Sequence, residues 1–106
     1  MNPRIPASYS ELGRWLHNFA TSHGKREHLA VEVVVETDEA REGRAYGLRL
    51  ILEGRIFPPP GAPPIELSYP EVAEGRSRFA WCEALAERIR AEVRRLAGDR
   101  REVRSV

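Results

Sequence analysis

The first periodic stretch of the chain, residues 8–22, has the apolar spacing of an α-helix. Its apolar residues recur three and four positions apart and so form one stripe: Tyr9, Leu12, Leu16, Phe19 and Ala20. Ser8 and Glu11 have the spacing of a capping box, which predicts that the helix begins here. Gly24 is expected to end the helix in a left-handed conformation.

The next two stretches alternate apolar and polar residues, which predicts a β-hairpin. The first stretch, "HLAVEVVVET", directs four apolar side chains to one face: Leu29, Val31, Val33 and Val35. In the second, "AYGLRLILEG", the corresponding side chains are those of Tyr46, Leu48, Leu50 and Leu52. The polar residues "DEAREGR" between them predict a turn. The opposite, charged faces, with Glu32 and Glu36 on one strand and Arg49 and Glu53 on the other, favour cross-strand ion pairs.

Six of the eight prolines lie within residues 55–70. Because proline lacks an N–H group and fixes φ at about −65°, residues 58–64 predict an extended crossing of the surface. This proline-rich loop also contains the P-x-x-P recognition pattern. We interpret it as a structural spacer, because the apolar Ile56 and Phe57 just before it are typical of core anchors.

A bend precedes the prolines and a third strand follows them. The dipeptide "EG" is compatible with a tight turn or with a bulge, and we favour a bulge at Gly54 because glutamate adopts a positive φ poorly. The residues "IELSY" predict a short strand that Pro70 ends. From residue 77 to residue 97 a helical stripe returns, with Gly98 at its end, and it comprises Cys82, Leu85, Ala86, Ile89, Val93 and Leu96.

The predicted order of elements is helix, three strands, helix. Because each element has one apolar face, both helices are expected on one face of an antiparallel three-stranded sheet, in a two-layer α+β fold. We expect a single domain over residues 1–98 and a frayed, charged tail over residues 99–106.

This order of elements resembles that of the double-stranded RNA-binding domain. That family carries a lysine-rich cluster at the start of its second helix and a Gly-Pro-x-His loop between its first two strands. Here the corresponding residues are "GRSRFA", with two arginines, and the acidic "DEAREGR". The resemblance therefore concerns topology alone. It implies duplex RNA as an alternative partner, contacted through Arg76, Arg78, Arg100, Arg101 and Arg104.

Charge and composition narrow the class of protein. The chain has 17 basic and 16 acidic residues, and its net charge of +1 gives no strong attraction to nucleic acid or to an anionic membrane. No apolar run is long enough to span a bilayer and the N-terminus lacks a signal-peptide pattern, so we expect a soluble, cytoplasmic protein. Arginine outnumbers lysine 16 to 1, which we attribute to a GC-rich genome such as that of a thermophile.

The residues with catalytic or metal-binding chemistry do not form a recognisable pattern. His17, His23 and His28 have no cysteine or carboxylate at metal-ligand spacing, so we expect no metal and no cofactor. Cys82 lies early in a helix but within its apolar stripe, where a buried, inert thiol is expected. The chain contains no phosphate-binding glycine loop and no nucleophile elbow. We therefore do not expect an enzyme.

Surface aromatic and apolar residues indicate instead an interaction with other proteins. Trp15 and Trp81 each lie one position off a helical stripe, at the expected border of the core. Val34 and Ile51 lie on the outer face of the sheet, which no predicted element covers. We expect a small non-catalytic interaction module, a homodimer, whose sheet face or tryptophan border binds a protein partner.

Overall fold

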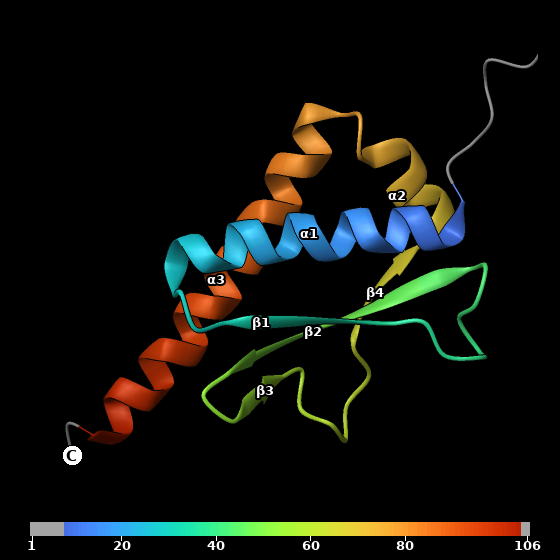
Figure 1. Cartoon of the computed structure of the whole chain (residues 1–106). Coiled ribbons are helices and arrows are strands. Elements are labelled where there is room, and N and C mark those ends of the chain that lie inside the picture. The colour runs from blue at the N-terminus through green and yellow to red at the C-terminus, as the bar shows by residue number, and fades with distance from the viewer. Residues whose placement is uncertain (1–7, 105–106) are drawn as a thin grey trace, which may run out of the picture.

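The computed structural model describes residues 8–104, with side chains described as far as residue 98, and it shows helices on one face of an antiparallel sheet (Figure 1). The helices are α1 (Tyr9–Glu27), α2 (Tyr69–Gly75) and α3 (Phe79–Arg104). The strands are β1 (Glu32–Glu36), β2 (Ala45–Leu52), β3 (Arg55–Phe57) and β4 (Ile65–Ser68). The predicted two-layer α+β fold is confirmed, and the structure adds a short helix and a fourth strand to it.

The sheet is built around β2, its longest strand. β1 pairs with one edge of β2, and both β3 and β4 pair with the other. Leu50 faces Phe57 whereas Leu48 faces Ile65. Two residues along β2 therefore correspond to eight residues along the segment that contains β3 and β4. β3 and β4 are therefore two pieces of one interrupted edge, and residues 58–64 leave the sheet between them.

The core lies between the sheet and the helices. All four predicted inward residues of β2 are buried, with Tyr46, Leu48 and Leu50 fully so. Val31 and Val33 are buried as predicted, but Leu29 is 81% exposed because it lies in the turn before β1. The predicted stripe of α3 is likewise buried except at Cys82, which is only half-buried and faces a groove between α1 and α3.

The first helix begins as predicted and ends later. Ser8 accepts a hydrogen bond from the amide of Glu11, whose side chain accepts one from the amide of Ser8. Gly24 does not end the helix but lies buried within it, where a Cβ atom would approach Val31 to 3.2 Å. The glycine is needed for this close contact, and α1 continues by one turn to its cap at His28.

The last helix is also longer than predicted. Gly98 lies inside α3, which extends to Arg104 instead of ending at residue 97. The backbone of residues 99–104, predicted as a frayed tail, is thus helical, because a single glycine with open space around it lowers helix stability without breaking the helix.

Two turns beside the prolines differ from the predicted conformations. Glu53 and Gly54 both have positive φ values, 51° and 84°, and they form the two-residue turn that joins β2 to β3. The expected bulge at Gly54 is wrong, because the twist of a tight hairpin requires a positive φ at both positions and prevails over the preference of glutamate. β4 ends at Ser68, one residue before the predicted end, because Tyr69 and Pro70 already belong to the first turn of α2. A second capping box, formed by Ser68 and Glu71, begins this helix.

Candidate functional site

One edge of the sheet is interrupted by the proline-rich loop, residues 58–64, which lies against outward-facing residues of β2. The guanidinium of Arg49 on β2 donates hydrogen bonds to three carbonyl oxygens of this loop, those of Pro58 (2.7 Å), Pro59 (3.0 Å) and Ala62 (2.9 Å). Its Nε donates to Glu36 on β1 at 2.8 Å, which confirms the predicted cross-strand ion pair. Pro64 is buried against Gly47, where a Cβ atom would lie 2.6 Å from the proline ring. These contacts hold the loop on the sheet.

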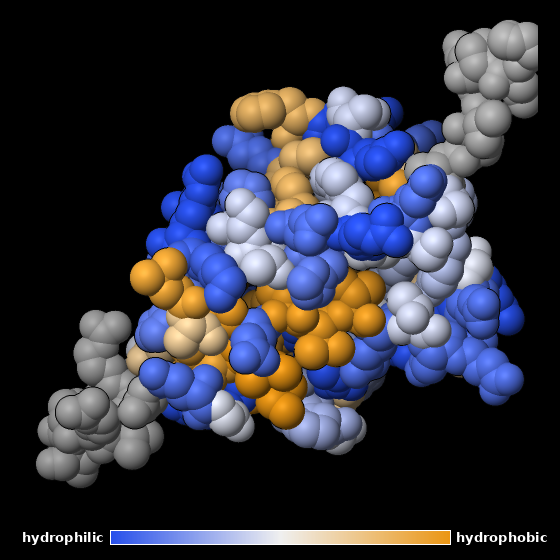
Figure 2. Space-filling view, viewed as in Figure 1, coloured by the Kyte–Doolittle hydropathy of each residue, from blue (hydrophilic) through white to orange (hydrophobic). Residues whose placement is uncertain are grey.

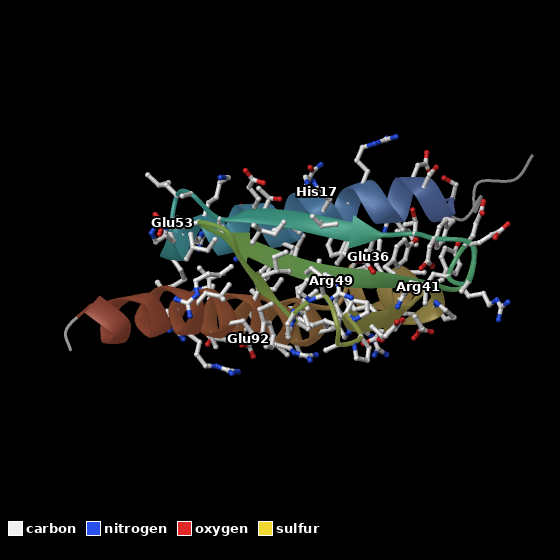
Figure 3. The ribbon with its side chains drawn as sticks, turned by 90° about the horizontal axis from the view of Figure 1, so that it is seen from below. His17, Glu36, Arg41, Arg49, Glu53 and Glu92 are labelled. Atoms are coloured by element: carbon white, nitrogen blue, oxygen red, sulfur yellow. The ribbon has the colours of Figure 1, made fainter. Side chains whose placement is uncertain are left out.

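A second arginine covers the neighbouring part of the outer face. Arg41, in the loop between β1 and β2, forms ion pairs with Glu66 on β4 and with Asp38, the latter at 2.8 Å. The hydrogen bond to Glu66 is the main cause that raises the pKa of Arg41. Figure 3, which looks onto this face, shows Arg41, Arg49 and Glu36 near one another on the sheet. The outer face is therefore partly covered, contrary to the expectation that nothing covers it.

The opposite edge of the sheet, β1, is open. Within residues 8–104, β1 pairs with β2 alone. Its sequence is "EVVVE", without a proline or a lysine to block further pairing. Val34 is 39% exposed, and Figure 2 shows apolar surface gathered below α1 at the level of β1. The two edges of the sheet thus differ, since the proline-rich loop interrupts one and the other is a continuous strand.

A groove of about 460 Å³ lies between this open edge and α1. The first half of α1 forms one wall, and the end of β1 with the following loop forms the other: Tyr9, Ser10, Gly13, His17, Val35, Thr37 and Glu42. Tyr9 fixes this end of α1, because its ring stacks on Tyr46 with 4.6 Å between centroids. The Tyr46 hydroxyl donates to the carbonyl oxygen of Tyr9 at 2.6 Å, and burial raises the pKa of Tyr46 to about 12.

The end of the groove beside the β1–β2 loop is acidic. Glu42 lines the groove, and the exposed Asp38 belongs to the same loop. The basic Arg41 of that loop forms ion pairs with Asp38 and with Glu66 on the outer face. Burial and then the carboxylates of Glu42 and Asp38 raise the pKa of the Tyr9 hydroxyl. Arg41 lowers this pKa and so opposes the two carboxylates, of which Glu42 lines the groove.

The predicted interface residues lie on two separate surfaces. Trp15 and Trp81 are half-buried at the border of the core, as predicted, and their rings stack with centroids 6.3 Å apart. Val34 and Ile51 lie on the outer face of the sheet, on the opposite side of the molecule from the helices. The structure therefore does not bring these four residues together into one site.

The arginines of the nucleic-acid alternative are only partly described. Arg76 and Arg78 are exposed between α2 and α3. The side chains of Arg100, Arg101 and Arg104 lie outside the described residues, although their backbone belongs to α3. Binding of duplex RNA stays a prediction.

Cys82 and His23 lie in a second groove, of about 350 Å³, between α1 and α3. The Cys82 thiol donates to the carbonyl oxygens of Gly75 and Arg76 at 3.6 and 3.5 Å. In the described part of the chain, no three or more His, Cys, Asp or Glu side chains are grouped so that they could hold a metal ion.

Acid is expected to destabilise the fold through His23. Burial, followed by the charges of Arg26 and Arg90, lowers the pKa of His23 below its ordinary 6.5. The unfolded chain, in which His23 has its ordinary pKa, binds a proton on this side chain more readily than the folded protein does. The free energy of unfolding is therefore highest above the ordinary pKa of 6.5 and falls as the pH is lowered through the pKa of the folded state. Urea denaturation at about pH 7.5 and about pH 5 measures the loss. His23→Asn should reduce it, whereas His17→Asn, at an exposed position, should not; equal losses in both variants would contradict the assignment.

Replacement of the exposed Pro59, Pro60 and Pro63 by alanine is expected to lower the free energy of unfolding by about 0.4 to 1 kcal/mol per site. The cause is the greater freedom of the unfolded chain, since Arg49 binds backbone oxygens that alanine retains. Thermal denaturation tests this expectation. Unchanged stability together with loss of a bound partner would show instead that the loop itself is recognised.

Comparison of the chain with models of protein families, with curated proteins and with solved structures finds no match. Among the described helices, none is both long and apolar enough to cross a membrane.

Sequence reasoning did not single out the groove beside β1 or the hydrogen bonds of Arg49 to the proline-rich loop. A sequence pattern shows that a strand is half-buried, but the pairing order decides which strand is at an edge. The available signal was the uninterrupted valine run of residues 33–35, in contrast to the prolines that follow β3.

Proposed function

We propose that this chain is a small non-catalytic interaction module that accepts an additional β-strand from a partner protein at its open sheet edge. The contrast between the two edges supports this function most directly. Proteins protect exposed edges with prolines, charges, bulges or covering loops, and an unprotected apolar edge is a template for pairing. The proline-rich loop, held by Arg49, interrupts the β3–β4 edge, whereas β1 is continuous and carries charges only at its two ends, Glu32 and Glu36.

The groove beside β1 also fits the addition of a strand. In this mode of recognition, main-chain hydrogen bonds supply affinity and pockets for alternate side chains supply specificity. Here the free edge supplies the main-chain partners, and the groove next to Val35 lies where alternate side chains of an added strand would point. The half-buried hydroxyl of Tyr9 already donates to the carbonyl oxygen of Ala45, which favours binding over catalysis.

Titration of the isotope-labelled protein with the neutral heptapeptide Thr-Val-Thr-Val-Thr-Val-Thr, followed by NMR, tests this function. The amide signals of β1 and of the groove wall of α1 are expected to shift, while those of Gly61 and Ala62 in the proline-rich loop should not. Two peptides N-methylated at alternate residues provide the control, because only one alternation removes the donors that face β1. Equal binding of both methylated peptides, or shifts at another surface, would reject strand addition.

A homodimer formed through the outer face of the sheet is a second proposal, favoured by the exposed Val34 beside Ile51 on that face. Light scattering at micromolar concentration is expected to give twice the chain mass of 12.0 kDa. Val34→Asp should return the mass to that of one chain, and Leu29→Asp, at an exposed residue outside this face, should not. A single-chain mass for the unaltered protein would rule this dimer out.

A further inference from the structure

We infer that the open edge is selective for an extended segment of a partner protein that places an apolar side chain against Val35 and a basic side chain beside Glu42. This inference rests on the strand addition proposed above and specifies the chemistry of the added strand.

The position of α1 allows only a single extended segment to pair with the open β1 edge. α1 packs over β1, and Figure 3 shows the helix reaching past the open edge of the sheet. Packed helices need about 8 to 10 Å between their axes, whereas paired strands lie only about 4.8 Å apart. A second copy of this chain, paired through β1, would bring its own α1 into the space that the first α1 occupies. A lone strand brings no such helix.

The charges around the groove favour a basic partner residue. Glu42 lines the groove, and Asp38 and Glu39 of the same loop are also exposed. Of the loop's two arginines, Arg41 pairs with Asp38 and with Glu66, so Asp38 is balanced, and Arg44 does not line the groove. His17 is the only basic residue among the described groove walls.

The positive end of α1 does not offset these carboxylates. Ser8 and Glu11 cap the first turn, and the Glu11 carboxylate compensates the partial positive charge of the helix start. An acidic partner segment would therefore meet the carboxylate of Glu42 at the loop end of the groove with little to balance it.

The apolar position follows from the two walls of the groove. Val35 is half-buried on one wall, and Gly13 lies on the other, where a Cβ atom would face the Tyr46 ring. Side chains two residues apart on a strand point to the same face and lie about 7 Å from each other. A partner segment of the pattern apolar-x-basic therefore places one side chain against Val35 and the next one toward Glu42.

The test compares two heptapeptides that differ in one charge. The basic peptide is Thr-Val-Thr-Val-Thr-Lys-Thr, and the acidic peptide has glutamate in place of the lysine. In NMR titrations of the full chain at low salt, the basic peptide is expected to bind about five- to tenfold more tightly. Glu42→Lys should abolish or reverse this preference. Glu83→Lys, the same charge change at an exposed position on α3 outside this groove, should leave it unchanged.

The outcomes separate this inference from the function on which it rests. If the neutral, basic and acidic peptides all fail to bind at the β1 edge, strand addition itself is wrong. If the basic and acidic peptides bind there equally well, strand addition stands and the charge selection is wrong. If added peptide dissociates a dimer of this chain, a second copy occupies the edge and the inference is overturned. For the unaltered protein, about 0.5 M salt should reduce the preference, which checks the charge effect without a substitution.

Discussion

Arg49→Met is expected to lower the free energy of unfolding by about 2 to 4 kcal/mol. The side chain of Arg49 is only 13% exposed, and it makes hydrogen bonds to Glu36 and to three backbone oxygens of the proline-rich loop. Each bond to a charged group contributes about 1.5 to 3 kcal/mol, and loss of all of them is partly offset when the released loop regains water. Urea denaturation measures the difference.

Two other variants show whether the several hydrogen bonds of the Arg49 guanidinium cause this loss of stability. Arg49→Lys keeps the charge but cannot reach several oxygens at once, so it should recover only a small part of the lost stability. Arg44→Met, at an exposed position in the β1–β2 loop, removes the same charge and should change stability by less than about 0.5 kcal/mol. Equal effects of the two methionine variants would show that Arg49 does not anchor the loop.

Gly75→Ala is expected to lower the free energy of unfolding by about 1 to 3 kcal/mol and to displace Trp81. A Cβ atom at Gly75 would lie 2.3 Å from Cδ2 of Trp81 and within 2.7 Å of two more ring atoms. The ring cannot move away without losing its stacking on Trp15 and its hydrogen bond to Glu71. Tryptophan fluorescence should therefore shift to longer wavelength as the displaced ring becomes exposed to water.

A matched glycine and a double-mutant cycle control for the effects of alanine itself. Gly98→Ala, inside α3 with no atom within 4 Å of the added methyl, should raise stability by up to about 1 kcal/mol. In a Trp81→Leu background, the clash with the indole is absent and Gly75→Ala should cost much less. If the cost is the same in both backgrounds, the contact with Trp81 is not its cause.

The hairpin and the long helices could be predicted from the sequence because their physical causes are local. Alternation fixes which face of β2 is buried, so Leu48 and Leu50 were assigned correctly without knowledge of their partners. The short α2 was also signalled, by Ser68, Pro70 and Glu71 in the arrangement of a helix start. Proline at this place was interpreted only as the end of a strand, and the helix that it begins was missed.

The interruption of the second edge and the open groove could not be predicted in the same way. β3 is only three residues long, and its pairing with β2 gives it strand conformation rather than its own pattern. The contacts of Arg49 with Pro58 and Ala62 depend on how the loop folds back over the sheet. Groove residues such as Gly13 and Thr37 carry no distinctive chemistry and are brought together only by the packing of α1 beside β1.

The proline-rich loop between β3 and β4 is a site where the chain can accept inserted residues. Both strands are held in register by their own pairing with β2, so residues added between them do not shift either strand. Gly61 lies at the exposed turn of the proline-rich loop, and a methyl group added to it would meet no atom within 4 Å. Doubling the length of a loop adds only about 0.6 kcal/mol of closure entropy. A tag or a whole small domain inserted beside Gly61 would therefore be carried on the surface while the sheet keeps its register.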